Sequence, residues 1–109
     1  MLAQVLLDAF ANTEIDGMNV ANGLEVMETT KKFAPHAILL DLILPGLDGF
    51  AVLEQLKADD KTKNIPVVVI SNLGDLGDVK SCLALGAEEY FIKANTQVKK
   101  IVDFVKKRI

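Results

Sequence analysis

The sequence has few of the residues that mark specialised classes of protein. It contains a single cysteine, Cys82, which excludes an intrachain disulfide and is typical of a reducing compartment, so we expect a cytoplasmic protein. No apolar run approaches the length of a membrane-spanning helix, and the apolar first residues lack a basic leader and are interrupted by Asp8. The net charge of −3 gives no basic footprint for nucleic acid. We therefore expect neither a membrane nor a nucleic-acid partner.

The remaining composition is that of an ordinary globular chain. Of the 109 residues, 50% are hydrophobic and 25% are charged. A chain of this length folds around one core. We therefore predict one domain over residues 1–109.

Apolar residues recur with alternating helical and strand periods along the chain. The helical period predicts helices over residues 2–10, 23–33 with Asn22 as the cap, 49–58, from 79 to a stop at Gly86, and 98–109. Short apolar runs between them predict strands over residues 18–21, 37–40, 67–70 and 89–92. Strands that alternate with helices predict a parallel sheet with helices on both faces.

Three of these strands end on residues that can bind or attack a phosphate group. Asp41, Ser71 and Lys93 follow the strands at 37–40, 67–70 and 89–92. In a parallel sheet the three ends lie at one edge, about 4.8 Å apart for each strand step. A carboxylate can act as a nucleophile and form an acyl phosphate, while a hydroxyl and an ammonium can bind its oxygens. This combination indicates phosphoryl-group chemistry with Asp41 at its centre.

Three segments make the chain similar to a known family, the receiver domains of two-component response regulators. They are DLILPGLDG at residues 41–49, IPVVVIS at 65–71 and GAEEYFIK at 86–93. The Asn22-Gly23 pair before the second helix also fits. The resemblance implies a flavodoxin-like doubly wound parallel sheet with helices on both faces, and a signalling module, not an enzyme.

The resemblance also implies a role for each residue at the edge of the sheet. Asp41 would accept a phosphoryl group from a histidine kinase or a phosphotransfer protein. Ser71 and Lys93 would contact that group, and Tyr90 would be the aromatic residue whose rotamer reports phosphorylation. The backbone carbonyl of Ile43 would bind Mg²⁺ beside Asp41.

The chain departs from the family at its beginning. The family's first, central strand and the acidic pair after it are missing, because Met1 stands where the first helix begins. Mg²⁺ prefers several oxygen ligands, so we expect weakened Mg²⁺ affinity with Asp41 as the carboxylate that is left. We also expect an open sheet edge that favours a homodimer or a strand-exchanged oligomer. Ala94 also replaces the proline usual after Lys93.

Two other functions compete with the signalling interpretation. A truncated or engineered receiver that is no longer phosphorylated could act as a binding or self-assembling module. A hydrolase of the aspartyl-phosphate type needs a second carboxylate two residues after the nucleophile, where this chain has Ile43. A dinucleotide-binding fold is not favoured, since no G-x-G-x-x-G follows any predicted strand.

Overall fold

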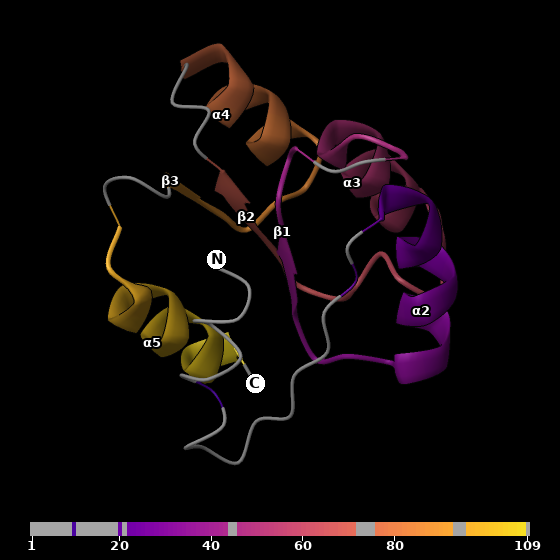
Figure 1. Ribbon diagram of the computed structural model, residues 1–109, viewed down its shortest axis with the longest axis horizontal. Coiled ribbons are helices and arrows are strands. Elements are labelled where there is room, and N and C mark those ends of the chain that lie inside the picture. Colours follow the sequence, from indigo (N-terminus) through magenta and orange to yellow (C-terminus); the bar gives the residue numbers. More distant parts are fainter. Residues whose placement is uncertain are drawn as a thin grey trace.

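The computed structural model describes residues 10, 20, 22–43, 46–71, 76–92 and 96–108. Helices and strands alternate along them, in the order η1 (Gly23–Glu25), α2 (Val26–Phe33), β1 (Ile38–Leu40), α3 (Gly49–Ala58), β2 (Val67–Ser71), α4 (Leu76–Ala84), β3 (Glu89–Ile92) and α5 (Val98–Arg108). The strands form one parallel sheet in the order β1-β2-β3 (Figure 1). None of the helices in this part of the chain has the length and apolar character of a membrane-spanning segment.

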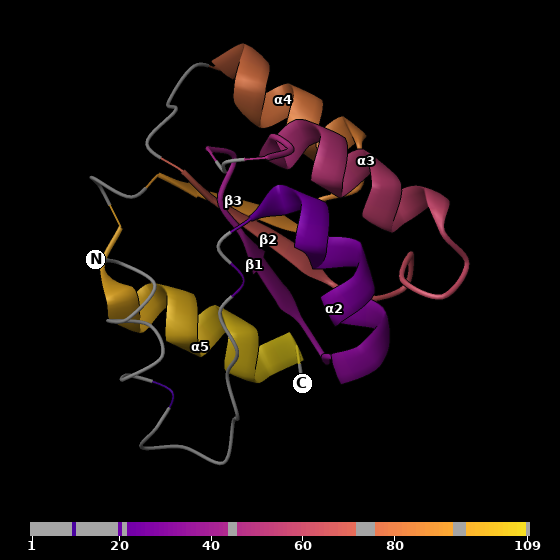
Figure 2. The same ribbon diagram turned by 45° about the vertical axis from the view of Figure 1, so that its right-hand side comes forward.

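Helices cover both faces of the sheet, which confirms the predicted α/β architecture. α2, α3 and α4 lie on one face, and α5 lies on the other (Figures 1 and 2). Val67 and Val69 of β2 belong to the core on the α3 side, and Val68 and Ile70 belong to the core on the α5 side. Successive residues of a strand point to opposite faces, so a strand covered on both faces is apolar throughout.

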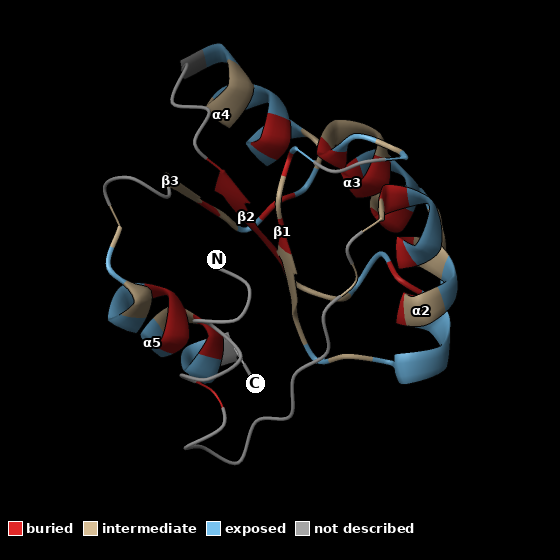
Figure 3. Cartoon of the chain, in the orientation of Figure 1, coloured by how far each residue is buried: buried red, intermediate tan, exposed pale blue. Residues whose placement is uncertain are grey.

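The central strand is the most deeply buried element of the described sheet. All residues of β2 are buried, because β1 and β3 flank it and helices cover it above and below (Figure 3). In β1, Leu40 is buried, whereas Ile38 and Leu39 are half-buried. The missing first strand and the self-association that it would favour stay predictions.

The predicted element boundaries agree with the structure in most places, and they differ most at α4 and at the start of α2, where Gly23–Glu25 form the separate 3-10 turn η1. The helix at 49–58 and the strand at 89–92 begin and end as predicted. α4 runs from Leu76 to Ala84, so it begins earlier than predicted and ends before Gly86. Asp78 lies in its first turn, where an acidic side chain favours the positive end of the helix.

Most of residues 2–10 and 18–21, the first predicted helix and strand, lie outside the described residues. Phe10 is helical and packs in the core on the α5 side, and Val20 is in neither a helix nor a strand.

Two polar side chains cap helices near the carboxyl edge of the sheet. Asp48 Oδ1 accepts a hydrogen bond of 3.0 Å from the Ala51 N–H and so caps α3. Asn22 Oδ1 accepts one of 2.8 Å from the Leu24 N–H and caps η1. Each bond satisfies a backbone N–H that a helix end leaves without an intrahelical partner.

The Lys57 side chain joins three segments at the opposite, amino edge of the sheet. Its Nζ donates hydrogen bonds to the carbonyl oxygens of Lys63, at 3.1 Å, and Ile65, at 2.9 Å. Its methylene groups pack against Gly86, which has a φ of +110°. Burial lowers the Lys57 pKa, and the nearby charge of Glu88 opposes that shift.

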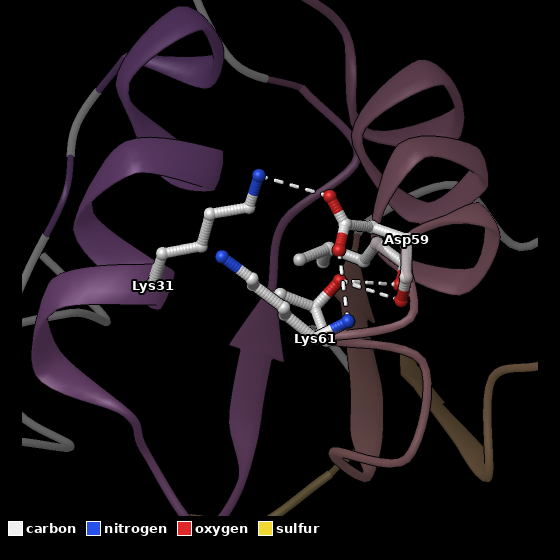
Figure 4. A network of polar contacts seen from close by, with 5 residues as sticks. Lys31, Asp59 and Lys61 are labelled. Atoms are coloured by element: carbon white, nitrogen blue, oxygen red, sulfur yellow. Dashed lines mark hydrogen bonds and ion pairs between the residues drawn. The ribbon is translucent and has the colours of Figure 1, made fainter.

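A second polar network ties α2 to the loop that follows α3. Lys31 Nζ lies 2.9 Å from Asp59 Oδ2, and the Lys61 N–H donates to Asp59 Oδ1 at 2.8 Å (Figure 4). The hydrogen bond from Lys31 and the one from the Lys61 N–H hold the Asp59 pKa below its ordinary value of 3.8. The carboxylate form of Asp59 therefore favours the folded state.

We expect the Asp59→Asn variant to be slightly less stable than the wild type at neutral pH. The folded-state pKa is lowered, so the stabilisation is present above the unfolded-state pKa and is lost as pH falls through the folded-state pKa. Urea unfolding at neutral pH and below pH 3.8 should show that the difference in stability between the wild type and Asp59→Asn becomes smaller in acid. Asp60→Asn is the control, because the Asp60 side chain is 90% exposed. An equal difference in stability at both pH values would contradict a stabilising role for the Asp59 carboxylate.

Candidate functional site

Asp41 lies directly after β1, at the carboxyl edge of the sheet, and is half-buried. Its Oδ1 accepts a hydrogen bond of 3.0 Å from the Ile43 N–H, which turns the chain sharply after the strand. Leu42 between them is buried in the core on the α3 side, and its carbonyl accepts a hydrogen bond of 2.9 Å from the Gly49 N–H. The core therefore anchors the backbone on which the Asp41 carboxylate is carried.

Ser71 reaches the same edge from β2, and Tyr90 lies one level below that edge on β3. Ser71 is the last residue of β2 and is completely buried. Leu40, Val69 and Tyr90 occupy one level of the sheet, and Ser71 lies two residues beyond that level, paired with Ile92. Asp41 and Ser71 therefore follow the same level of the sheet on adjacent strands.

The pKa of Tyr90 depends on its burial and on the groups around it. Burial is the largest cause that raises the Tyr90 pKa above its ordinary value of 10.0, and a side-chain hydrogen bond with Ser71 opposes it. The charges of Asp78 and Asp41 raise the Tyr90 pKa further. Tyr90 therefore contacts Ser71 and lies within the electrostatic reach of Asp41.

Lys93, the third predicted strand-end residue, lies outside the described residues. The described part of β3 ends at Ile92, the partner of Ser71 in the sheet. The backbone around Ala94, where the family usually has proline, is also outside the described part. The role of Lys93 stays a prediction.

Few oxygen ligands for a cation come together in the described part of the chain. No group of three or more His, Cys, Asp or Glu side chains that could hold a metal occurs there. Asp41 and the backbone of Ile43 lie together in one turn, whereas Asp48 caps α3. Mg²⁺ sites often use one or two carboxylates, with waters and substrate phosphates completing the octahedron. These residues fit a Mg²⁺ site of that sparse kind.

Sequence reasoning missed the residues that shape the turn after Asp41. The Asn22 side chain, 24 positions before Gly46, occupies the space that a Cβ on Gly46 would fill. Gly46 has a φ of +86°, in the left-handed region that favours glycine. The sequence contains the Asn22-Gly23 pair and the Pro45-Gly46 turn, but no local pattern joins two segments so far apart.

Comparison with known proteins identifies the family. Residues 1–106 match the response regulator receiver domain. The chain is 33% identical over 105 residues to sporulation initiation phosphotransferase F of Bacillus subtilis, covering 95% of this chain and 82% of that protein. It is 37% identical over 89 residues to the response regulator PleD of Caulobacter vibrioides, covering 81% of this chain and 20% of PleD.

Other relatives are much longer than this chain, and solved structures share its fold. The chain spans 31% of the probable transcriptional regulator ycf27 of Porphyridium aerugineum, at 33% identity over 72% of this chain. The receiver domain of RstA from Klebsiella pneumoniae superposes with a TM-score of 0.89 at 20% identity, covering 98% of this chain and 88% of that one. The phosphorylated cyanobacterial phytochrome response regulator RcpA gives 0.80 at 31% identity, with 95% and 80% covered. This chain therefore belongs to the response regulator receiver domain family.

Proposed function

We propose that Asp41 accepts a phosphoryl group from a histidine kinase or a phosphotransfer protein, as receiver domains do. The observation that carries the proposal is that Asp41 and Ser71 end adjacent strands at the carboxyl edge of the sheet, with Tyr90 close enough for both groups to affect its pKa. In open α/β sheets this edge is where ligands bind. Sporulation initiation phosphotransferase F, a relative matched over most of its length, is named for the transfer of phosphoryl groups.

The chemistry of the step follows from the groups at the edge. A carboxylate oxygen of Asp41 attacks the phosphorus atom of a phosphohistidine, the P–N bond breaks, and its electron pair stays on the imidazole, which takes up a proton. The product is an acyl phosphate on Asp41. A Mg²⁺ ion held by Asp41 and the Ile43 carbonyl would neutralise charge on the transferred group. Because few ligands come together among the described residues, we propose that this chain binds Mg²⁺ weakly.

Phosphorylation would change the partner of the Ser71 hydroxyl. A phosphoryl group adds about −1.5 to −2 charges and strong acceptor oxygens to Asp41. Ser71, now hydrogen-bonded to Tyr90, would donate to a phosphoryl oxygen, and Lys93 would add a cation. Tyr90 would lose its hydroxyl partner, and the surface formed by α4, β3 and α5 would change its preference for binding proteins.

We expect intact-protein mass to increase by one phosphoryl group when the chain is incubated with acetyl phosphate and Mg²⁺. The Asp41→Asn variant should show no gain, because an amide is not a nucleophile of this kind. Asp48→Asn is the matched control: Asp48 lies in the same loop, and asparagine caps a helix as well as aspartate does. No gain under conditions that phosphorylate a complete receiver domain would contradict the proposal and favour a phosphorylation-independent binding module.

Tyrosine fluorescence should report the switch directly, because Tyr90 is the one tyrosine and the chain has no tryptophan. We expect stoichiometric phosphorylation to change the emission of the wild type, since the Ser71 hydroxyl leaves Tyr90. The Ser71→Ala variant should still gain the phosphoryl group but should lose most of that change in emission. Emission that stays constant while the wild type becomes phosphorylated would exclude Tyr90 as a reporter.

Alkaline titration of the single tyrosine should measure its environment. We expect the absorbance of the folded protein to give a Tyr90 pKa above 10.0, and the denatured protein to give the ordinary value. A raised folded-state pKa means that the associated stability is present below the unfolded-state pKa and is lost as pH rises through the folded-state pKa. Ser71→Ala should raise the Tyr90 pKa further. A folded-state pKa at or below 10.0 would contradict the described burial.

A further inference from the structure

The turn that follows Asp41 is held from outside by the segment that begins α2. Gly46 has a φ of +86°, and a Cβ placed on it would lie 2.9 Å from Asn22 Cγ and overlap Asn22 Oδ1. Asn22 and Gly46 are therefore in direct contact, although 24 positions separate them in the sequence. The described part of the turn consists of residues 41–43 and 46–49, which we call the acceptor loop.

The Asn22 side chain cannot easily yield at this contact. Its Oδ1 accepts the 2.8 Å hydrogen bond from the Leu24 N–H that caps η1. A side chain that moved away from Gly46 would give up this cap and leave a helix-end N–H without that partner. The contact therefore couples the position of Gly46 to the start of η1.

Two further glycines bring backbone against backbone around the same loop. A Cβ on Gly23, the residue after Asn22, would overlap the Leu47 carbonyl oxygen. A Cβ on Gly49 would lie 2.6 Å from the Asp41 carbonyl oxygen and would overlap Leu42 Cα. Backbone atoms at such positions have no rotamer to change, so the acceptor loop fits closely between η1 and the end of β1.

We propose that Asn22 is a positioning residue for the acceptor Asp41, an inference that rests on the proposed phosphoryl transfer. Asn22 restricts Gly46 in the middle of the acceptor loop, while Gly49 at its end packs against the backbone of Asp41 and Leu42 at its start. Asp41 belongs to the second contact, and Ile43 lies between the two contacts in the sequence. In-line attack on phosphorus requires a fixed approach, and a displacement of about 1 Å can slow a reaction on the order of a hundredfold.

The test compares alanine substitutions at two glycines that have similar backbones but lie at opposite edges of the sheet. Gly46→Ala strains a φ of +86° and displaces Asn22. Gly86→Ala strains a φ of +110°, and its Cβ would meet Lys57 Cγ at 3.0 Å, far from the acceptor loop. Both variants should lose stability for the same reason, so Gly86→Ala controls for destabilisation.

The main readout is the maximal rate of phosphorylation by saturating acetyl phosphate and Mg²⁺, per folded molecule. We expect Asn22→Ala and Gly46→Ala to lower this rate on the order of tenfold or more, and Gly86→Ala to leave it within about twofold. The Asn22→Ala, Gly46→Ala double variant should be about as slow as the slower single variant, because both changes break one contact. Equal slowing by Gly46→Ala and Gly86→Ala, or fully multiplicative effects in the double variant, would overturn the proposal.

Amide hydrogen exchange tests the same contact without phosphorylation. The Gly49 N–H, bonded to the Leu42 carbonyl at 2.9 Å, should exchange faster in Asn22→Ala than in the wild type. The Glu88 N–H, bonded to the Val67 carbonyl at 2.9 Å, is the control at the other edge and should be unaffected. If the wild type takes up no phosphoryl group, the proposed function fails, and this measurement alone decides the positioning role. Unchanged exchange at Gly49 would then overturn it.

Discussion

The arrangement of this molecule depends on the burial of β2. Its residues are covered by helices on both faces and by a strand on each side, so a shift of one residue would move Val67 and Val69 into the wrong core. This constraint sets the register of the neighbouring strands. Asp41 and Ser71 reach the same edge because Leu40, Val69 and Tyr90 are held at one level.

Close packing of backbone atoms limits how the acceptor loop can move. The acceptor loop has little freedom, because Gly23, Gly46 and Gly49 each stand where a side chain would strike a neighbouring atom. Ser71, at the end of the neighbouring strand β2, has a hydroxyl that affects the Tyr90 pKa. Tyr90 lies in the core beside α4. Under the proposed function, a change of charge on Asp41 would act through Ser71 on Tyr90, which is buried beside α4.

The buried strand β2 and the turn after Asp41 could be predicted from the sequence. The run Val67 to Ile70 predicts a strand buried on both faces, and the Pro45-Gly46 turn predicts where the chain turns after Asp41. The contact between Asn22 and Gly46 could not be predicted, because it depends on how α2 packs beside the turn and has no local periodicity. The hydrogen bond between Ser71 and Tyr90 depends in the same way on the register of β2 and β3. The early start of α4 was missed because Gly77 is usually read as part of a loop.

The central claim is that Asp41, Ser71 and Tyr90 respond as one site to a phosphoryl group. The most direct test is an amide-resolved NMR titration of the chain with beryllofluoride and Mg²⁺, since beryllofluoride mimics a phosphoryl group on a carboxylate. We predict that the amide signals of these three residues shift together, while those of Ile38 and Val67 at the amino edge stay in place. Shifts that persist in Asp41→Asn, or a response at Asp41 that leaves Ser71 and Tyr90 unchanged, would contradict the account.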